Sequence, residues 1–141
     1  MRINTRFPVA VHMLALIELN QTQTSTSELM ALSVGTNPVV IRQLMSALKR
    51  AGLIETQSGV PGCHLAKPAR EITLREIYRA VQRKSDAPLF DFHPNPNPQC
   101  PIGRNIREAL DTPLLDAQTA MEQALENYTL QDVADRISRR L

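Results

Sequence analysis

The sequence predicts a mostly helical fold in which a short helix, a glycine turn and a longer helix are followed directly by a two-stranded hairpin. Three observations lead to this prediction: a capped amphipathic segment over residues 38–50, β-prone residues flanking a turn over 53–66, and a long apolar period over 102–128. A helix–turn–helix with a hairpin behind it is a winged helix-turn-helix. The long apolar period adds a C-terminal helix whose stripe can pack on its own domain or on a second copy of the chain.

Length and composition limit the class of protein. The chain has 141 residues, 43% of them hydrophobic and none of them tryptophan, which suits one domain with an aliphatic core. Charge is uneven: residues 1–84 hold 11 Lys/Arg against 5 Asp/Glu, whereas residues 85–141 hold 5 against 9. A basic front half favours a polyanionic partner. The most apolar stretch, 7–19, is too short to span a membrane and no cleavage site follows it, so we expect a cytoplasmic protein with no membrane partner.

The first two helices are predicted from apolar period and capping residues. Residues 7–19 are apolar almost all round, so this helix should be buried. A hydroxyl within Thr24–Ser27 can cap a short second helix that holds Leu29, Met30 and Leu32. Gly35 then provides the positive φ of a tight turn.

The third helix has the clearest signals. Asn37 is a good N-cap, and Pro38 stands at the first helical position, where its missing N–H costs nothing. Lys49 and Arg50 complement the helix dipole, and Gly52 ends the helix. The inward stripe consists of Val40, Ile41, Leu44, Met45 and Leu48.

A hairpin and a fourth helix come next. We expect a strand over 53–57, a turn over 58–62 and a returning strand over 63–66, which together form the wing. Thr73 and Glu76 have the spacing of a capping box for a helix that reaches Val81.

The C-terminal half opens with an arm. Residues 83–101 contain five prolines and should be extended rather than helical. The apolar stripe from Ile102 to Tyr128 predicts a helix of about 40 Å, which Pro113 should kink or split. A last short helix should start near Thr129.

Four segments together resemble one family. They are TNPVVIRQLMSALKRAGLI (36–54), GVPGCHLAKP (59–68), EITLREIYRAV (71–81) and HPNPNPQCPIGRNI (93–106). Their order resembles the bacterial winged-helix repressors that include the regulator of iron–sulfur cluster assembly, the nitric-oxide-sensing repressor and the cysteine-metabolism repressor, in a branch without a cluster. The resemblance implies a winged helix-turn-helix DNA-binding domain over 1–82, a proline-rich arm over 83–101, and a helical dimerisation region over 102–141. It also implies a homodimer that reads two half-sites about 34–36 Å apart on double-stranded DNA.

Two departures from the family pattern bear on function. Cluster-binding members place three cysteines in the arm, but residues 83–104 hold only Cys100, and one thiolate per chain cannot hold a four-thiolate cluster. We therefore expect no iron–sulfur cluster and no other cofactor. Family wings often carry an arginine, but residues 56–62 hold no cation, so this wing should contact the DNA backbone.

The predicted DNA contacts come mainly from the third helix. Arg42 corresponds to a base-reading position in the family, and an arginine pairs bidentately with guanine; a solvated surface arginine is the alternative. Hydroxyl groups near helix N-termini suit phosphates, although they also suit simple capping. The full predicted set is Thr5, Arg6, Thr26, Ser27, Thr36, Asn37, Val39, Arg42, Gln43, Ser46, Lys49 and Ser58.

Cysteines, histidines and arm aromatics supply the remaining candidates. Cys63 on the wing and Cys100 at the end of the arm are candidate redox thiols, and two unreactive cysteines are the favoured alternative. Cys100 is the better candidate, because Arg104 and a helix N-terminus would favour its thiolate. No histidine or cysteine pair has the spacing of a metal site. An effector pocket between arm and wing would be lined by Leu89, Phe90 and Phe92, unless these residues only dock the arm.

These observations favour one function over two others. We predict a sequence-specific DNA-binding transcriptional regulator, a homodimeric repressor that responds to a small-molecule or thiol-redox signal. The alternative is a winged-helix protein-interaction module that does not read DNA. An enzyme is not supported, because no nucleophile–base pair, phosphate loop or metal set is found.

Overall fold

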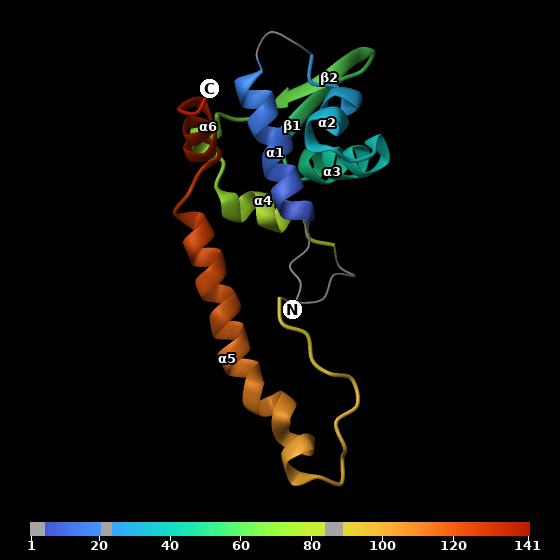
Figure 1. Ribbon diagram of the computed structural model, residues 1–141, viewed down its shortest axis with the longest axis vertical. Helices are drawn as coiled ribbons and strands as arrows, with labels where there is room; N and C mark the ends of the chain where they lie inside the picture. The colour runs from blue at the N-terminus through green and yellow to red at the C-terminus, as the bar shows by residue number, and fades with distance from the viewer. Residues whose placement is uncertain (1–4, 21–23, 84–88) are drawn as a thin grey trace.

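The computed structural model describes residues 5–20, 24–83 and 89–141. In chain order its elements are α1 (Arg6–Leu19), α2 (Ser27–Val34), α3 (Pro38–Arg50), β1 (Ile54–Gln57), β2 (Val60–Leu65), the 3₁₀ turn η1 (Ala69–Glu71), α4 (Leu74–Val81), α5 (Pro101–Glu126) and α6 (Leu130–Ser138). Figure 1 shows a body built from every element except α5, which extends away from it. The mostly helical winged fold is therefore confirmed.

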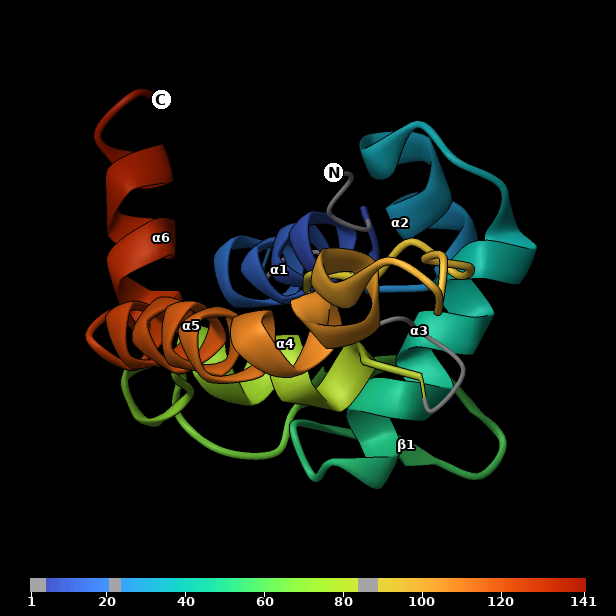
Figure 2. The ribbon, with the colours of Figure 1, turned by 90° about the horizontal axis from the view of Figure 1, so that it is seen from below.

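The predicted burial of the first helix is confirmed. Ala10, Met13 and Leu14 of α1 are fully buried, and α1 lies between α6 on one side and α2 and α3 on the other (Figures 1 and 2). The core around it also includes Ile41, Leu44, Ile72, Ile77 and Leu130. Since Leu130 belongs to α6, the C-terminal helix shares the core of the N-terminal domain, whereas α5 contributes no buried residue.

The predicted helix-turn-helix forms as its capping residues require. Thr26 accepts a hydrogen bond from the Leu29 amide, and Asn37 accepts one from the Val40 amide. Gly35 has φ of 82°, so the turn between α2 and α3 uses its freedom to be left-handed. Ile41, Leu44 and Leu48 face inward as expected.

The wing is confirmed, but its turn was predicted in the wrong place. The turn is Ser58–Gly59, and the returning strand begins at Val60 rather than at Cys63. The pairs Gln57–Val60 and Glu55–His64 enclose one residue on β1 and three on β2, so β2 contains a bulge. Pro61 and Gly62 signal a turn in the sequence, yet a bulge in an edge strand accommodates both residue types.

The segment around α4 differs from prediction in two details. Thr73 caps α4, but the Glu76 carboxylate lies 2.8 Å from the Lys67 Nζ atom, so the reciprocal bond of the predicted capping box does not form among the described residues. A capping box does form at the start of α6, between Thr129 and Asp132. The short turn η1 was not predicted. It brings Ile72 to α6, where its carbonyl accepts from the Leu130 amide at 2.8 Å.

The arm and α5 together form an extension that projects from the body. Residues 89–100 form neither helix nor strand, as Pro94, Pro96 and Pro98 require, and they run beside α5 from the body to its far end, where the helix begins (Figure 1). α5 is a single helix with Pro113 inside it, so the proline does not split it. None of the helices in the described ranges is long and apolar enough to cross a membrane.

Candidate nucleic-acid interface

The outer face of α3 carries most of the predicted contacts. Because an α-helix repeats every 3.6 residues, burial of Ile41, Leu44 and Leu48 turns the intervening positions outward. The outward residues are Val39, Arg42, Gln43, Ser46 and Lys49, all of them exposed. Val39 is 53% exposed, so its side chain adds apolar surface to this face. Within the described ranges, no side chain pairs with Arg42, so its guanidinium is available to a ligand.

The N-termini of α2 and α3 present polar groups beside this face. Thr26 and Asn37 each cap their helix, with amide-to-oxygen distances of 3.2 and 3.1 Å. The Ser27 hydroxyl donates to Glu28 at 3.1 Å, and Thr36 is half-buried in the turn. Capping leaves the amides of the first turn oriented outward, which is the arrangement that binds phosphate.

Lys49 links α3 to the wing. The Lys49 Nζ atom donates to the Thr56 hydroxyl at 2.7 Å, so α3 and β1 are linked at their solvent edge. Ser58 is exposed in the wing turn. The Lys49 ammonium and the Thr56 hydroxyl therefore lie side by side. If α3 were bound in a DNA groove, both groups would face the DNA backbone.

Thr5 and Arg6 lie at the start of α1. Thr5 is exposed and makes no side-chain cap. The Arg6 Nε atom donates to the Val81 carbonyl at 3.0 Å, which holds the start of α1 against the end of α4. Sequence reasoning missed this structural role, because a contact across 75 residues leaves no local signal. A guanidinium has five N–H donors, so the bond does not preclude a phosphate contact.

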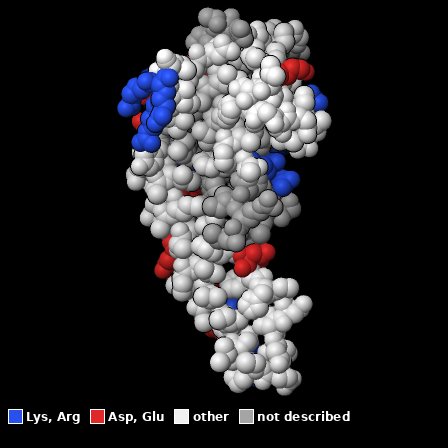
Figure 3. Space-filling model, in the orientation of Figure 1, with Lys and Arg blue, Asp and Glu red and all other residues white. Residues whose placement is uncertain are grey.

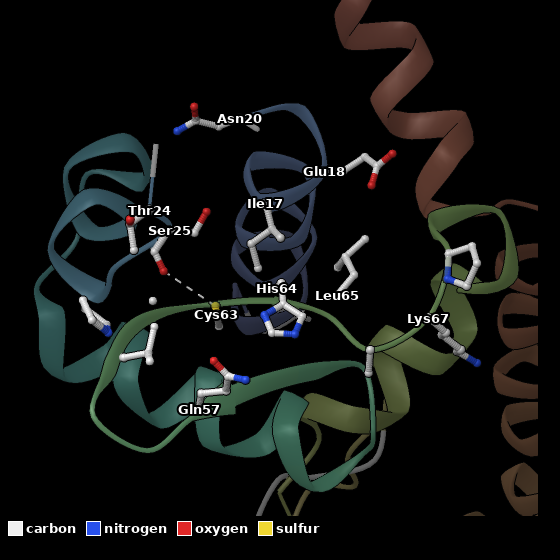
Figure 4. A pocket seen from close by; sticks show the side chains of 15 residues that line it. Ile17, Glu18, Asn20, Thr24, Ser25, Gln57, Cys63, His64, Leu65 and Lys67 are labelled. Carbon is white, nitrogen blue, oxygen red and sulfur yellow. Dashed lines mark hydrogen bonds between the residues drawn. The ribbon is translucent and has the colours of Figure 1, made fainter. Parts of the chain in front are cut away.

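Hydrogen bonds join the returning strand of the wing, β2, to the loop before α2. The Cys63 amide donates to the Ser25 carbonyl at 3.2 Å, and the Cys63 thiol points to the same oxygen at 3.7 Å (Figure 4). Gly62, with φ of 89°, lies so close that a Cβ there would stand 2.4 Å from the Thr24 methyl carbon. Sequence reasoning treated Gly62 as a turn residue and missed this junction between wing and helix-turn-helix.

Comparison with known proteins identifies the family to which this chain belongs. The sequence profile of the Rrf2 family, described as iron-dependent transcriptional regulators, matches residues 3–136.

The chain belongs to the Rrf2 family.

A candidate HTH-type transcriptional regulator of Bacillus subtilis (strain 168), YwnA, is 44% identical over 135 residues, which cover 96% of this chain and 98% of YwnA. A crystal structure of a candidate DNA-binding protein is 41% identical, with a TM-score of 0.73 over 91% of this chain and 97% of that one. CymR, the global cysteine regulator of B. subtilis, is only 18% identical, but it shares the fold with a TM-score of 0.65 over 96% of this chain and 98% of its own. The protein is therefore a transcriptional regulator of the Rrf2 family, and the resemblance drawn from its sequence is confirmed.

The two cysteines of this Rrf2 protein occupy different environments. Burial raises the pKa of the Cys63 thiol from 9.0 to about 11, so the thiol stays protonated near neutral pH. Cys100 is half-buried and caps α5, where its sulfur accepts from the Gly103 amide at 3.5 Å. No group of three or more metal-binding side chains occurs in the part of the chain that the structure describes.

The arm of this Rrf2 protein packs on α5. Phe90 and Phe92 line a small cavity with Leu114 and Leu115, and the Arg107 guanidinium lies 4.7 Å from the centre of the Phe92 ring. The predicted pocket between arm and wing is wrong, because the wing lies at the opposite end of the molecule (Figure 1). The aromatic residues hold the arm to α5 instead.

Ion pairs fix α5 to the body of this Rrf2 protein. The Arg79 Nε atom donates to the Glu122 carboxylate at 2.7 Å, and the Arg75 Nε atom lies 3.7 Å from the same oxygen. Glu122 is only 13% exposed, and the hydrogen bond from Arg79 holds the pKa of its carboxyl below the ordinary value. The C-terminal end of α5 is thereby held against α4.

Proposed function

We propose that this Rrf2 regulator binds double-stranded DNA as a homodimer, with α3 of each protomer in the major groove, and that it represses transcription. The observation that supports this proposal most directly is the outer face of α3, where Arg42, Gln43 and Ser46 are exposed. Arginine and glutamine are the side chains that pair bidentately with guanine and adenine. A dimer seated on a promoter excludes other proteins from that DNA, which is the simplest route to repression.

The backbone contacts come from the elements around α3. Phosphates are bound by the hydroxyls of Thr26, Ser27 and Thr36 and by the amides of the first turns of α2 and α3. Lys49 neutralises one phosphate, and Ser58 in the wing turn contacts the DNA backbone next to it. Thr5 and Arg6 extend the contacts along the strand. Since the wing turn carries no cation, sequence reading rests on α3 rather than on the width of the minor groove.

The dimer forms through α5. This helix has 26 residues and none is buried, although Ile102 and Leu115 are large apolar side chains with exposures of 76% and 64%. So much exposed apolar surface on one helix is typical of an oligomer interface. Leu115→Glu should therefore turn the dimer into a monomer in sedimentation equilibrium. Leu32→Glu, which alters an even more exposed leucine on α2, should leave the dimer intact.

The signal that we propose is a small molecule rather than a thiol oxidant. Cys63 is buried and its pKa is raised to about 11, so its thiolate is rare at neutral pH. Cys100 is half-buried and its sulfur caps α5, so oxidation of this thiol is the alternative signal, which the titration below tests. A regulator without enzyme activity, acting in the cytoplasm, would then respond through a ligand pocket.

One titration tests the DNA-binding proposal. Purified protein is added to fluorescent DNA from upstream of its own gene, at several salt concentrations, once reduced and once after thiol oxidation. We expect the logarithm of the affinity to fall steeply with the logarithm of salt, by about 0.9 for each phosphate neutralised, and to be insensitive to oxidation. Binding that collapses on oxidation would refute the small-molecule signal. Equal, shallow binding to random DNA would favour the interaction-module function.

A further inference from the structure

A groove lies along α1, with α6 on one side and Ser33 of α2 on the other. Its volume is about 440 Å³, which is within the range of small-molecule sites. Its walls are mainly apolar and include Val11, Ala15, Leu16 and Leu19 of α1 with Val133 and Ile137 of α6. Such a groove suits the hydrocarbon body of a small ligand.

A polar pair closes one edge of this groove. The His12 Nε2 atom of α1 lies 2.9 Å from the Ser33 hydroxyl, and both residues line the groove. Ser33 belongs to α2, the first helix of the helix-turn-helix. The polar edge is thus the point at which the groove touches the DNA-binding element.

Cations gather beside the groove on α6. Arg136, Arg139 and Arg140 are all exposed, and Figure 3 shows a blue patch over this helix. Arg140 follows the groove residue Ile137 by three residues, and its amide donates to the Ile137 carbonyl. Arg136 stacks on the Tyr128 ring at 5.5 Å. Together with Asp132 and Asp135, these arginines give residues 130–141 a net charge of +1, so the charge of this segment beside the groove favours an anion.

We propose that the α1–α6 groove binds a small apolar carboxylate, with its chain along the apolar walls and its carboxylate at His12. The regulatory part of this proposal rests on the proposed function. An apolar lining excludes highly polar metabolites, and the arginine patch together with the His12 donor selects an acid over an alcohol of equal length. For contact with a second copy of the chain we have proposed α5, which carries the more exposed Ile102 and Leu115.

Binding at this site would weaken DNA binding. With its proton on Nε2, His12 donates to Ser33 and holds α2 against α1. A carboxylate accepts a stronger hydrogen bond than a hydroxyl does, so the ligand takes this donor and releases Ser33. α2 supports α3, and loosening it raises the dissociation constant for DNA. By linkage, DNA must weaken binding of the carboxylate by the same factor.

The first experiment measures ligand binding without DNA. Octanoate, radiolabelled, is the probe in equilibrium dialysis against the full chain, with octanol as the neutral analogue of equal length. We expect saturable binding of one octanoate per chain, and octanol binding weaker by about tenfold. Ile137→Glu, at a position 38% exposed and therefore tolerant of substitution, should weaken octanoate binding by about tenfold or more through like charge. Leu32→Glu, 81% exposed and outside the groove, should bind octanoate as the wild type does.

Absence of saturable octanoate binding, or equal effects of the two glutamate variants, would overturn the site. Octanol binding as tightly as octanoate would overturn the role of the carboxylate.

The second experiment adds DNA. Saturating octanoate should raise the dissociation constant of the wild type and of Leu32→Glu for the upstream DNA by about threefold or more, and it should not affect Ile137→Glu. An unchanged constant in the wild type would refute the regulatory coupling. Failure of the ligand-free protein to bind DNA would instead refute the proposed function, while the dialysis result would still decide the site.

Discussion

Gly62 offers a sharp test of how the wing is attached to the helix-turn-helix. The substitution Gly62→Ala introduces two costs. Its φ of 89° lies in the left-handed region, where a side chain costs about 1–2 kcal/mol. The new Cβ would also stand 2.4 Å from the Thr24 methyl carbon and 3.3 Å from the Ser25 carbonyl oxygen. Relief of such a clash by shifting β2 or Thr24 adds about 1–3 kcal/mol.

Gly59 provides a matched control in the same hairpin. Its φ is 76°, but a Cβ there would meet nothing within 4 Å, so Gly59→Ala carries only the backbone cost. In urea unfolding at equal chain concentration, we expect Gly62→Ala to lose about 1–3 kcal/mol more stability than Gly59→Ala. Thr24→Ser removes the offending methyl group, so in that background the difference between the two alanine variants should shrink. Equal losses for Gly62→Ala and Gly59→Ala would refute the close approach and, with it, the wing junction.

Three further predictions concern the recognition helix, the α4–α5 joint and the thiols. Arg42→Ala should cost about 1–3 kcal/mol of affinity for the upstream DNA and relax preference at one base pair per half-site, measured by anisotropy on singly substituted duplexes; a uniform loss on all duplexes would make Arg42 a phosphate contact. Glu122→Gln should cost about 1 kcal/mol at pH 7. Because Arg79 lowers the pKa of the folded carboxyl, this stabilisation is fully present above the ordinary value of 4.5 and is lost as pH falls through the lower folded-state pKa, so the two proteins should converge in acid urea titrations. Cys63, with its pKa of about 11, should resist iodoacetamide at pH 8 in the folded protein and react on unfolding, and rapid modification of Cys63 detected by mass spectrometry would show that the site opens.

Local sequence signals were sufficient for the helices and their order. Thr26, Asn37, Thr73 and Thr129 each cap a helix, and a cap acts within four residues, so it can be recognised without knowledge of the fold. The period of apolar residues likewise gave the buried faces of α1 and α3. The family resemblance added what the local signals do not contain, namely the relation of the helix-turn-helix to a regulator.

Contacts between distant segments could not be predicted in this way. Pro61-Gly62 has the composition of a turn, and only the approach of Ser25 makes it a bulge. Arg6 was predicted at the DNA backbone and also holds Val81. The groove beside α1 exists because α6 returns to the body, and nothing in residues 130–138 states which surface that short amphipathic helix will cover. Each of these features depends on long-range packing rather than on local propensity.

In the proposed homodimer, the α4–α5 joint would set how accurately the two α3 helices are placed on DNA. A helix of 26 residues is about 39 Å long, so a tilt of about 10° at its stem moves the far end by about 7 Å. Successive base pairs are about 3.4 Å apart, so this displacement would put the second recognition helix about two base pairs out of register. The stem therefore has to be held by something stiffer than apolar contact alone. Glu122, nearly buried and shared by Arg75 and Arg79, meets this requirement, since a paired carboxylate is directional and costly to leave without its partners. We accordingly expect Glu122→Gln to reduce the affinity of the dimer for paired half-sites more than its affinity for a single half-site, whereas a purely stabilising ion pair would affect both alike.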